Sequence, residues 1–207
     1  MKKTTSKWLQ ERANILAKYA QGLPHALDRI KLRFDYPEFG WIDVHVLKND
    51  EEVGIMEFSD VYDTFVDLME WLEAIAKNDN IACAVNMNCE DCHEVFGYEP
   101  VWFFDGKPDN SWGRHPRECG IFIWYQGWKE AFPLDAYCNT RQFIRDIYTC
   151  IMDFSKKMKD EPKFLDDWDC SNYLLEGMEY DEEDPRMKYL FYNRMKSEII
   201  EDYLDIS

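Results

Sequence analysis

The segment IKLRFDYPEFGWIDVHVL, residues 30–47, decides the fold because apolar and polar side chains alternate along both of its halves. A period of two sends successive side chains to opposite faces of a strand, so each half predicts a strand with one dry face. Between the halves, residues 37–40 (PEFG) are of types that favour a turn. A second turn at residues 49–52 leads into a third apolar run, 53–58. The sequence therefore predicts a three-stranded antiparallel meander.

Directly after the meander the apolar period changes to that of a helix, in YDTFVDLMEWLEAIAKND (residues 62–79). Its apolar residues recur at intervals of three and four, which predicts an amphipathic helix with Asp60 or Asp63 as its cap. The same spacing predicts a helix over residues 8–20 and another that follows Asn139 and extends to residue 158.

Further apolar runs predict four more strands, at residues 81–87, 95–104, 120–126 and 128–134. The polar segment 105–118 contains two prolines and two glycines and is predicted to be a long loop. We therefore expect an α+β fold, with an antiparallel sheet of about six to seven strands in two meanders and amphipathic helices between and after them.

The last quarter of the chain has a different composition. Residues 1–158 are predicted to form the α+β domain, and residues 159–207 an acidic helical C-terminal extension packed on the same domain. The run DEEDP (residues 181–185) predicts the start of a final helix, because the first turn of a helix favours negative charge and proline. The apolar face of that helix would extend from Met187 to Leu204.

The chain is strongly acidic, with a formal net charge of −17 over 207 residues. Residues 159–207 hold fifteen Asp and Glu against six Lys and Arg, a balance of −9. A negative field of this size repels phosphate backbones, so we expect no nucleic-acid partner. It attracts cations instead, and the expected partner is a basic protein.

The location and the redox state are also predicted from the sequence. The N-terminal residues contain no apolar stretch long enough for a signal peptide, and no segment approaches the roughly 18 apolar residues that a membrane-spanning helix needs. We therefore expect a cytoplasmic protein without a membrane partner. Seven cysteines, an odd number, are scattered along the chain and are interpreted as reduced, buried thiols that act as small apolar side chains.

The segment NCEDCHEV, residues 88–95, contains the C-x-x-C-H string of c-type haem attachment. The flanking residues alternate with a period of two, and the chain shows no export signal, so a hairpin turn fits the segment better than haem or a redox pair. We expect no cofactor. One metal site stays open as an alternative, in which zinc is held by Cys89, Cys92, His115 and Cys119.

Catalytic motifs are not recognised in this sequence. It contains neither a G-x-S-x-G nucleophile motif nor the glycine-rich cradles of nucleotide-binding proteins. Aromatic residues in polar surroundings are typical of protein interfaces, where they act as anchors. The candidate partner-binding residues are Trp112, Trp128, Asp166, Asp167, Trp168 and Asp169.

Two neighbouring motifs carry a resemblance. GWIDVHV (residues 40–46) and VYDTFVDLMEWLEAIA (residues 61–76) resemble a pattern of small bacterial proteins in which a G-W-I-D hairpin leads into a Y-D-x-F-x-D-L-x-x-W-L-E-x-I helix. Some acidic α+β proteins of this kind are similar to immunity proteins that neutralise toxins of neighbouring cells. The resemblance implies a binding function and no reaction.

Together these features favour a non-enzymatic cytoplasmic protein that binds a basic protein partner, such as a bacterial toxin. Two alternatives remain open at this stage. One is a metal-dependent or thiol enzyme that uses residues 105–119 as a lid, and the other is a phage or mobile-element inhibitor of a host defence protein.

Overall fold

The structure is a computed structural model that describes the following residues: 28–62, 64–77, 83–89, 92–104, 107–108, 118–126, 134–170, 173–174, 181 and 186–206. The helix predicted over residues 8–20 lies outside this part of the chain. Among the described helices, none combines the length and the apolar character needed to cross a membrane.

The first sheet is the predicted meander. Its strands are β1 (Ile30–Phe34), β2 (Trp41–Lys48) and β3 (Glu51–Ser59), which pair antiparallel in the order β1-β2-β3. The register places Leu32 opposite Val46 and Phe34 opposite Val44, so apolar residues of neighbouring strands share a face. That face is buried, as the alternation in residues 30–47 predicts.

A second sheet contains β4 (Cys83–Cys89), β5 (Cys92–Phe104), β7 (Glu118–Gln126) and β8 (Asp135–Asn139), in the order β4-β5-β7-β8. The short strand β6 (Lys107–Pro108) pairs with β5. The α+β class with antiparallel pairing is confirmed, but the prediction of a single sheet of six to seven strands is wrong. Alternation identifies a strand and its dry face, but it does not specify which strands pair.

Strand β8 was not predicted. Its described buried residues, Ala136 and Cys138, are small, and alanine has a weak preference for strands. Pairing with β7, where Ile121 lies opposite Cys138, brings this segment into the sheet. The strand predicted at residues 128–134 lies outside the described residues except for Leu134, which precedes β8.

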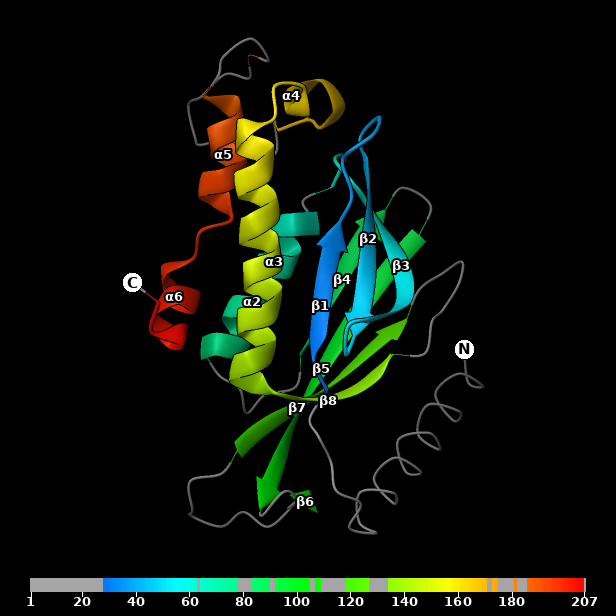
Figure 1. Cartoon of the computed structure of the whole chain (residues 1–207), viewed down its shortest axis with the longest axis vertical. Coiled ribbons are helices and arrows are strands. Elements are labelled where there is room, and N and C mark those ends of the chain that lie inside the picture. The colour runs from blue at the N-terminus through cyan, green and yellow to red at the C-terminus, as the bar shows by residue number, and fades with distance from the viewer. Residues whose placement is uncertain are drawn as a thin grey trace.

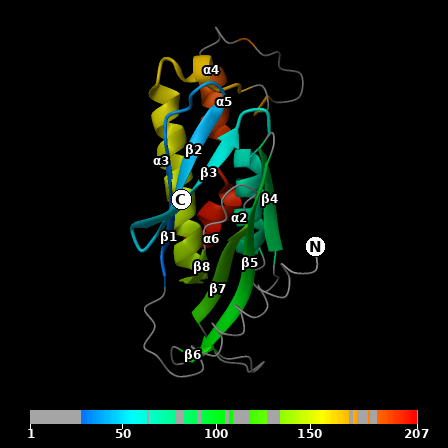
Figure 2. The ribbon, with the colours of Figure 1, turned by 90° about the vertical axis from the view of Figure 1, so that its right-hand side faces the viewer.

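Two long helices cover the sheets. They are α2 (Thr64–Lys77) and α3 (Thr140–Asp160), and both match the predicted amphipathic segments. Asn139 caps α3, because its side chain accepts a hydrogen bond from the N–H of Gln142 at 3.0 Å. Figure 1 shows the helices on one side of the molecule and the strands of both sheets on the other, and Figure 2 shows the same arrangement from the side.

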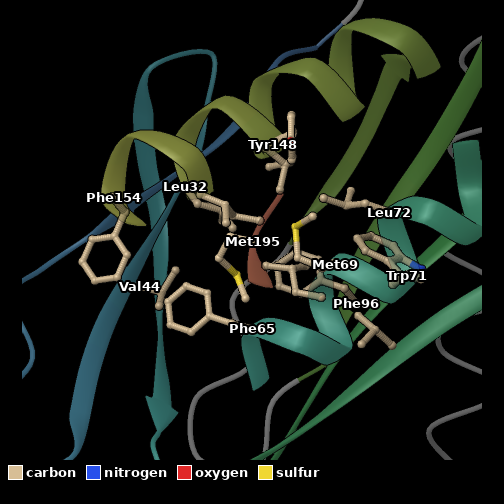
Figure 3. Close-up of a cluster of buried hydrophobic side chains, with 14 of the residues drawn as sticks. Leu32, Val44, Phe65, Met69, Trp71, Leu72, Phe96, Tyr148, Phe154 and Met195 are labelled. Carbon is tan, nitrogen blue, oxygen red and sulfur yellow. The ribbon is translucent and has the colours of Figure 1, made fainter. Parts of the chain in front are cut away.

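One core joins both sheets to the helices, as the close-up in Figure 3 shows. Phe65 of α2 stacks on Phe154 of α3 with ring centroids 5.7 Å apart. Trp71 of α2 contacts Phe96 of β5, with centroids 6.1 Å apart. Burying one such aromatic side chain stabilises a fold by roughly 1.5–3 kcal/mol, so the contacts between helices and sheets hold the domain together.

The C-terminal region forms α4 (Phe164–Asp167), α5 (Met187–Arg194) and α6 (Glu198–Leu204). The prediction of one continuous final helix is therefore wrong. Ser197 ends the continuity, because its side chain caps α6 by accepting from the N–H of Ile200 and its own N–H donates to the hydroxyl of Tyr148 at 3.2 Å. Phe164 and Phe191 belong to the common core.

Candidate protein-binding site

The acidic segment Asp166 to Asp169 lies at the end of α4, and one buried aromatic ring attaches it to the core. Trp168 is 1% exposed, and its ring contacts Phe65 edge-on, with centroids 5.9 Å apart. Trp168 is one of the predicted partner-binding residues, but its indole is buried and offers no exposed ring to a partner. Asp166 and Asp169 are exposed on either side of it, and Asp167 is half-buried.

Two hydrogen bonds made by its backbone attach this segment to the end of the first sheet. The N–H of Gly40 donates to the carbonyl of Asp167 at 2.9 Å, and the N–H of Asp169 donates to Oδ2 of Asp60 at 3.0 Å. Gly40 and Asp60 are themselves joined, because the N–H of Asp60 donates to the carbonyl of Gly40 at 2.9 Å. Figure 1 shows α4 at the same end of the molecule as the connection between β1 and β2. The acidic segment is thus held in one position.

Gly40 is required at this junction. Its φ is +82°, in the left-handed region that favours glycine. A Cβ atom at this position would lie 2.7 Å from Oδ1 of Asp60, well inside van der Waals contact. The close approach of the Gly40 backbone to the Asp60 side chain therefore depends on the missing side chain.

Asp60 has a different role from the one predicted. The sequence proposes it, or Asp63, as the cap of α2, whereas its carboxylate accepts from the backbone of Asp169. Asp63 lies outside the described residues. Burial raises the pKa of Asp60, the hydrogen bond from Asp169 opposes that rise, and the neighbouring charge of Asp169 adds to it. A partner 109 positions away leaves no signal in the local sequence.

The negative potential at this end acts on Tyr36. Its hydroxyl is buried, and its pKa is raised to about 12, first by burial and then by the charges of Asp167, Glu161 and Asp166. We name Asp60, Glu161, Asp166, Asp167 and Asp169 the acidic end. Lys163 is the one basic residue between Asp160 and Cys170.

A tight turn borders the acidic end. Glu38 and Trp41 exchange two backbone hydrogen bonds, of 2.8 and 3.0 Å, and enclose Phe39 and Gly40. The side chain of Phe39 is 90% exposed, and that of Val61, which follows Asp60 in the chain, is 59% exposed. Sequence reasoning missed both residues, because their apolar side chains fit the general pattern of a folded domain.

The remaining predicted partner-binding residues, Trp112 and Trp128, lie outside the described part of the chain, as does His115 of the zinc alternative. Cys89 lies directly opposite Cys92 in the β4–β5 ladder, which confirms the hairpin predicted for NCEDCHEV. Cys119 lies on a different strand, β7, where the register places it opposite Trp102 of β5.

The register separates two of the four residues of the zinc alternative along the sheet. Trp102, and with it Cys119, lies ten residues along β5 from Cys92, and a strand rises about 3.3 Å per residue, which separates them by roughly 30 Å. Zinc–sulfur bonds are about 2.3 Å long, so this backbone separation argues against one ion shared by Cys92 and Cys119. Within the described residues, no group of three or more His, Cys, Asp and Glu side chains could hold a metal ion.

The described thiols are poor nucleophiles. Burial raises the pKa of Cys83, Cys138, Cys150 and Cys170, that of Cys170 to about 12. These thiols are therefore protonated at neutral pH, whereas the thiolate is the reactive form. They serve as small apolar side chains, as the sequence predicts for its cysteines.

The class that fold and site define is an α+β domain with two antiparallel sheets and an ordered acidic end. Comparisons with protein-family models, with curated proteins and with solved structures found no match.

Proposed function

We propose that this chain is a non-enzymatic cytoplasmic protein that binds a basic protein partner at its acidic end. The observation that carries the proposal is the attachment of residues 166–169 to Gly40 and Asp60. This attachment, with Trp168 in the core, holds three aspartates in one position while two of them stay exposed. An ordered acidic surface binds without the entropic cost of ordering a loop.

The charge supports a basic partner. Carboxylates of like sign repel each other at the acidic end, and cations of a partner would relieve that repulsion. The net charge of −17 would also steer a basic protein toward this chain before contact. Steering of this kind weakens with salt, because the screening length is about 10 Å at 0.1 M and shorter above it.

A bacterial toxin domain is the partner class that the resemblance of residues 40–46 and 61–76 favours. In that role the chain would be an immunity protein, which binds a toxin tightly and prevents its action. The acidic end would then cover a basic surface that the toxin uses on its own target.

The test is capture of a partner from the source cells with the full chain at low salt, followed by calorimetry with the purified partner at two salt concentrations. We expect a stoichiometric basic protein whose affinity falls as salt rises. The triple substitution Asp166→Asn, Asp167→Asn and Asp169→Asn should weaken binding about tenfold and reduce the salt dependence.

A matched control removes exposed charge elsewhere. Asp43 and Glu57 lie directly opposite each other on β2 and β3, and both are exposed. The variant Asp43→Asn with Glu57→Gln should keep the affinity within about threefold, since exposed charges outside an interface contribute little to binding. The proposal is wrong if no stoichiometric protein is recovered, or if salt and the triple substitution leave the affinity unchanged.

A further inference from the structure

The turn at residues 38–41 has a backbone that one of its two central residues, Phe39, does not favour. Phe39 and Gly40 have φ values of 52° and 82°, and the flanking residues Glu38 and Trp41 exchange two backbone hydrogen bonds. Two left-handed central residues define a type I′ turn, in which the first central position favours Asn, Asp or Gly. A bulky residue in that conformation is an outlier.

Burial does not explain Phe39 either. Its side chain is 90% exposed, so the ring contributes little apolar contact to the fold. The position thus combines an unfavourable backbone conformation with an exposed aromatic ring. Because strained residues cluster where a protein binds or acts, this combination points to function.

Hydrogen bonds of the neighbouring Gly40 hold the turn that carries Phe39 beside the acidic end. The N–H of Gly40 donates to the carbonyl of Asp167, and the carbonyl of Gly40 accepts from the N–H of Asp60. Val61 follows Asp60 and is 59% exposed, so a second apolar side chain lies next to the same junction. We name Phe39 and Val61 the apolar tip.

We infer that the apolar tip inserts into an apolar pocket of the partner, and that Lys or Arg side chains around that pocket meet the aspartates of residues 166–169. This inference rests on the proposed function and specifies its site. An aromatic anchor with a charged border is the usual source of affinity in a protein interface, because the ring is fully desolvated while the border supplies orientation.

The charge of the acidic end decides between possible occupants. In a symmetric dimer of this chain through the apolar tip, the two acidic ends would face each other and repel. Anionic lipid headgroups would be repelled in the same way. A basic protein is the occupant whose charge complements this surface.

The first test separates binding from folding. Phe39→Asn introduces a residue that the turn favours, so we expect its melting temperature to rise by about 2 °C or more while its affinity for the partner falls at least about tenfold. Ile55→Asn is the control, since Ile55 is 46% exposed on β3, and it should leave the affinity unchanged. If the melting temperature of Phe39→Asn falls instead, Phe39 supports the fold and the inference is wrong.

The second test uses a photo-crosslinking phenylalanine analogue, placed at position 39 or at position 55 of the full chain, with the captured basic protein as the probe. We expect a crosslink from position 39 and not from position 55. A partner that binds in a salt-dependent manner but crosslinks equally from both positions, or binds Phe39→Asn as tightly as the unmodified chain, overturns this inference and leaves the proposed function in place. If no salt-dependent partner exists, both are wrong.

Discussion

Asp60 accepts a hydrogen bond from the backbone N–H of Asp169, 3.0 Å away and 109 positions later in the chain. A second hydrogen bond lies close to the first, in which the N–H of Gly40 donates to the carbonyl of Asp167. Gly40 is bonded to Asp60 through its carbonyl, and Asp167 lies two positions before Asp169. Sheet and acidic segment are therefore joined at two points, and each point can be tested by substitution.

Gly40→Ala should lower the free energy of unfolding by about 1–3 kcal/mol, because alanine is strained at a positive φ and its Cβ would displace the Asp60 carboxylate. Chemical denaturation measures the loss, and hydrogen exchange at the amide of Asp169 should become faster. Gly54→Ala in β3 is the control, since Gly54 is outside the left-handed region, and it should be neutral or stabilising. Equal losses in the two variants would contradict this role of Gly40.

Asp60→Asn should change the pH dependence of stability. The folded-state pKa of Asp60 is raised, so protonation favours the folded state, and this contribution is present below the unfolded pKa and lost as pH rises through the folded value. Asparagine keeps an acceptor for Asp169 without the charge. We therefore expect a stability gain of a few tenths of a kcal/mol at pH 7, reduced by solvent screening, that disappears below pH 3.8.

Chemical denaturation of the unmodified chain and of Asp60→Asn from pH 3 to pH 8 gives the difference between their free energies of unfolding at each pH. A stability difference that grows toward low pH would have the wrong sign and would refute the assignment. Asp60→Ala is a second comparison, because it removes the acceptor as well as the charge and should be less stable than Asp60→Asn at pH 7.

Tyr148→Phe should lower the free energy of unfolding by about 1–3 kcal/mol, because it leaves a buried N–H without its acceptor. The Tyr148 hydroxyl accepts from the N–H of Ser197 at 3.2 Å and donates to Oε1 of Glu201 at 2.9 Å, so it attaches α6 to α3. Tyr189→Phe, at a residue that is 46% exposed, should change stability by less than about 0.5 kcal/mol. Thermal denaturation of both variants measures the two stability losses. Similar losses in Tyr148→Phe and Tyr189→Phe would mean that the hydroxyl of Tyr148 does not stabilise the fold.

Arg29 and Asp146 should show a coupling of about 1–3 kcal/mol in a double-mutant cycle, because the carboxylate is nearly buried and binds the guanidinium through two bonds. The Nε and terminal nitrogen of Arg29 donate to Asp146 at 2.9 and 2.6 Å, and Asp146 is 7% exposed. The cycle compares the unmodified chain with Arg29→Met, Asp146→Leu and the variant that carries both substitutions. The exposed pair Arg33 and Glu52 should couple by less than about 1 kcal/mol, and an equally small value for the first pair would refute its structural role.

The sequence predicts much of the local structure, because periodicity depends on neighbours within a few residues. The alternation in residues 30–47 identifies β1 and β2, and the change of period at residue 62 identifies α2. Where local preference and tertiary contact compete, the sequence is a poorer guide. Ser197 divides the final helix because its N–H reaches Tyr148, and that contact is invisible in the sequence around residue 197.

For the candidate site, the composition of residues 166–169 identifies an acidic segment, and in the structure two of its aspartates, Asp166 and Asp169, are exposed. It does not show that Trp168 is buried, since an aromatic residue among aspartates has the same sequence signature whether its ring faces solvent or the core. It also misses Phe39, because nothing in PEFG shows that the phenylalanine occupies a left-handed turn position with its ring in solvent.

By itself, the amino-acid sequence determined the strands and helices whose apolar residues recur with a regular period. It also determined the α+β class and the strong negative charge. All of these depend on residue type and on spacing over a few residues. The tertiary structure alone decided that the strands divide into two sheets, that Trp168 is buried, and that Gly40 and Asp60 hold the acidic segment beside Phe39. The burial of Trp168 and the attachment of the acidic segment depend on contacts between residues more than a hundred positions apart, and such contacts form only when the chain packs around its common core.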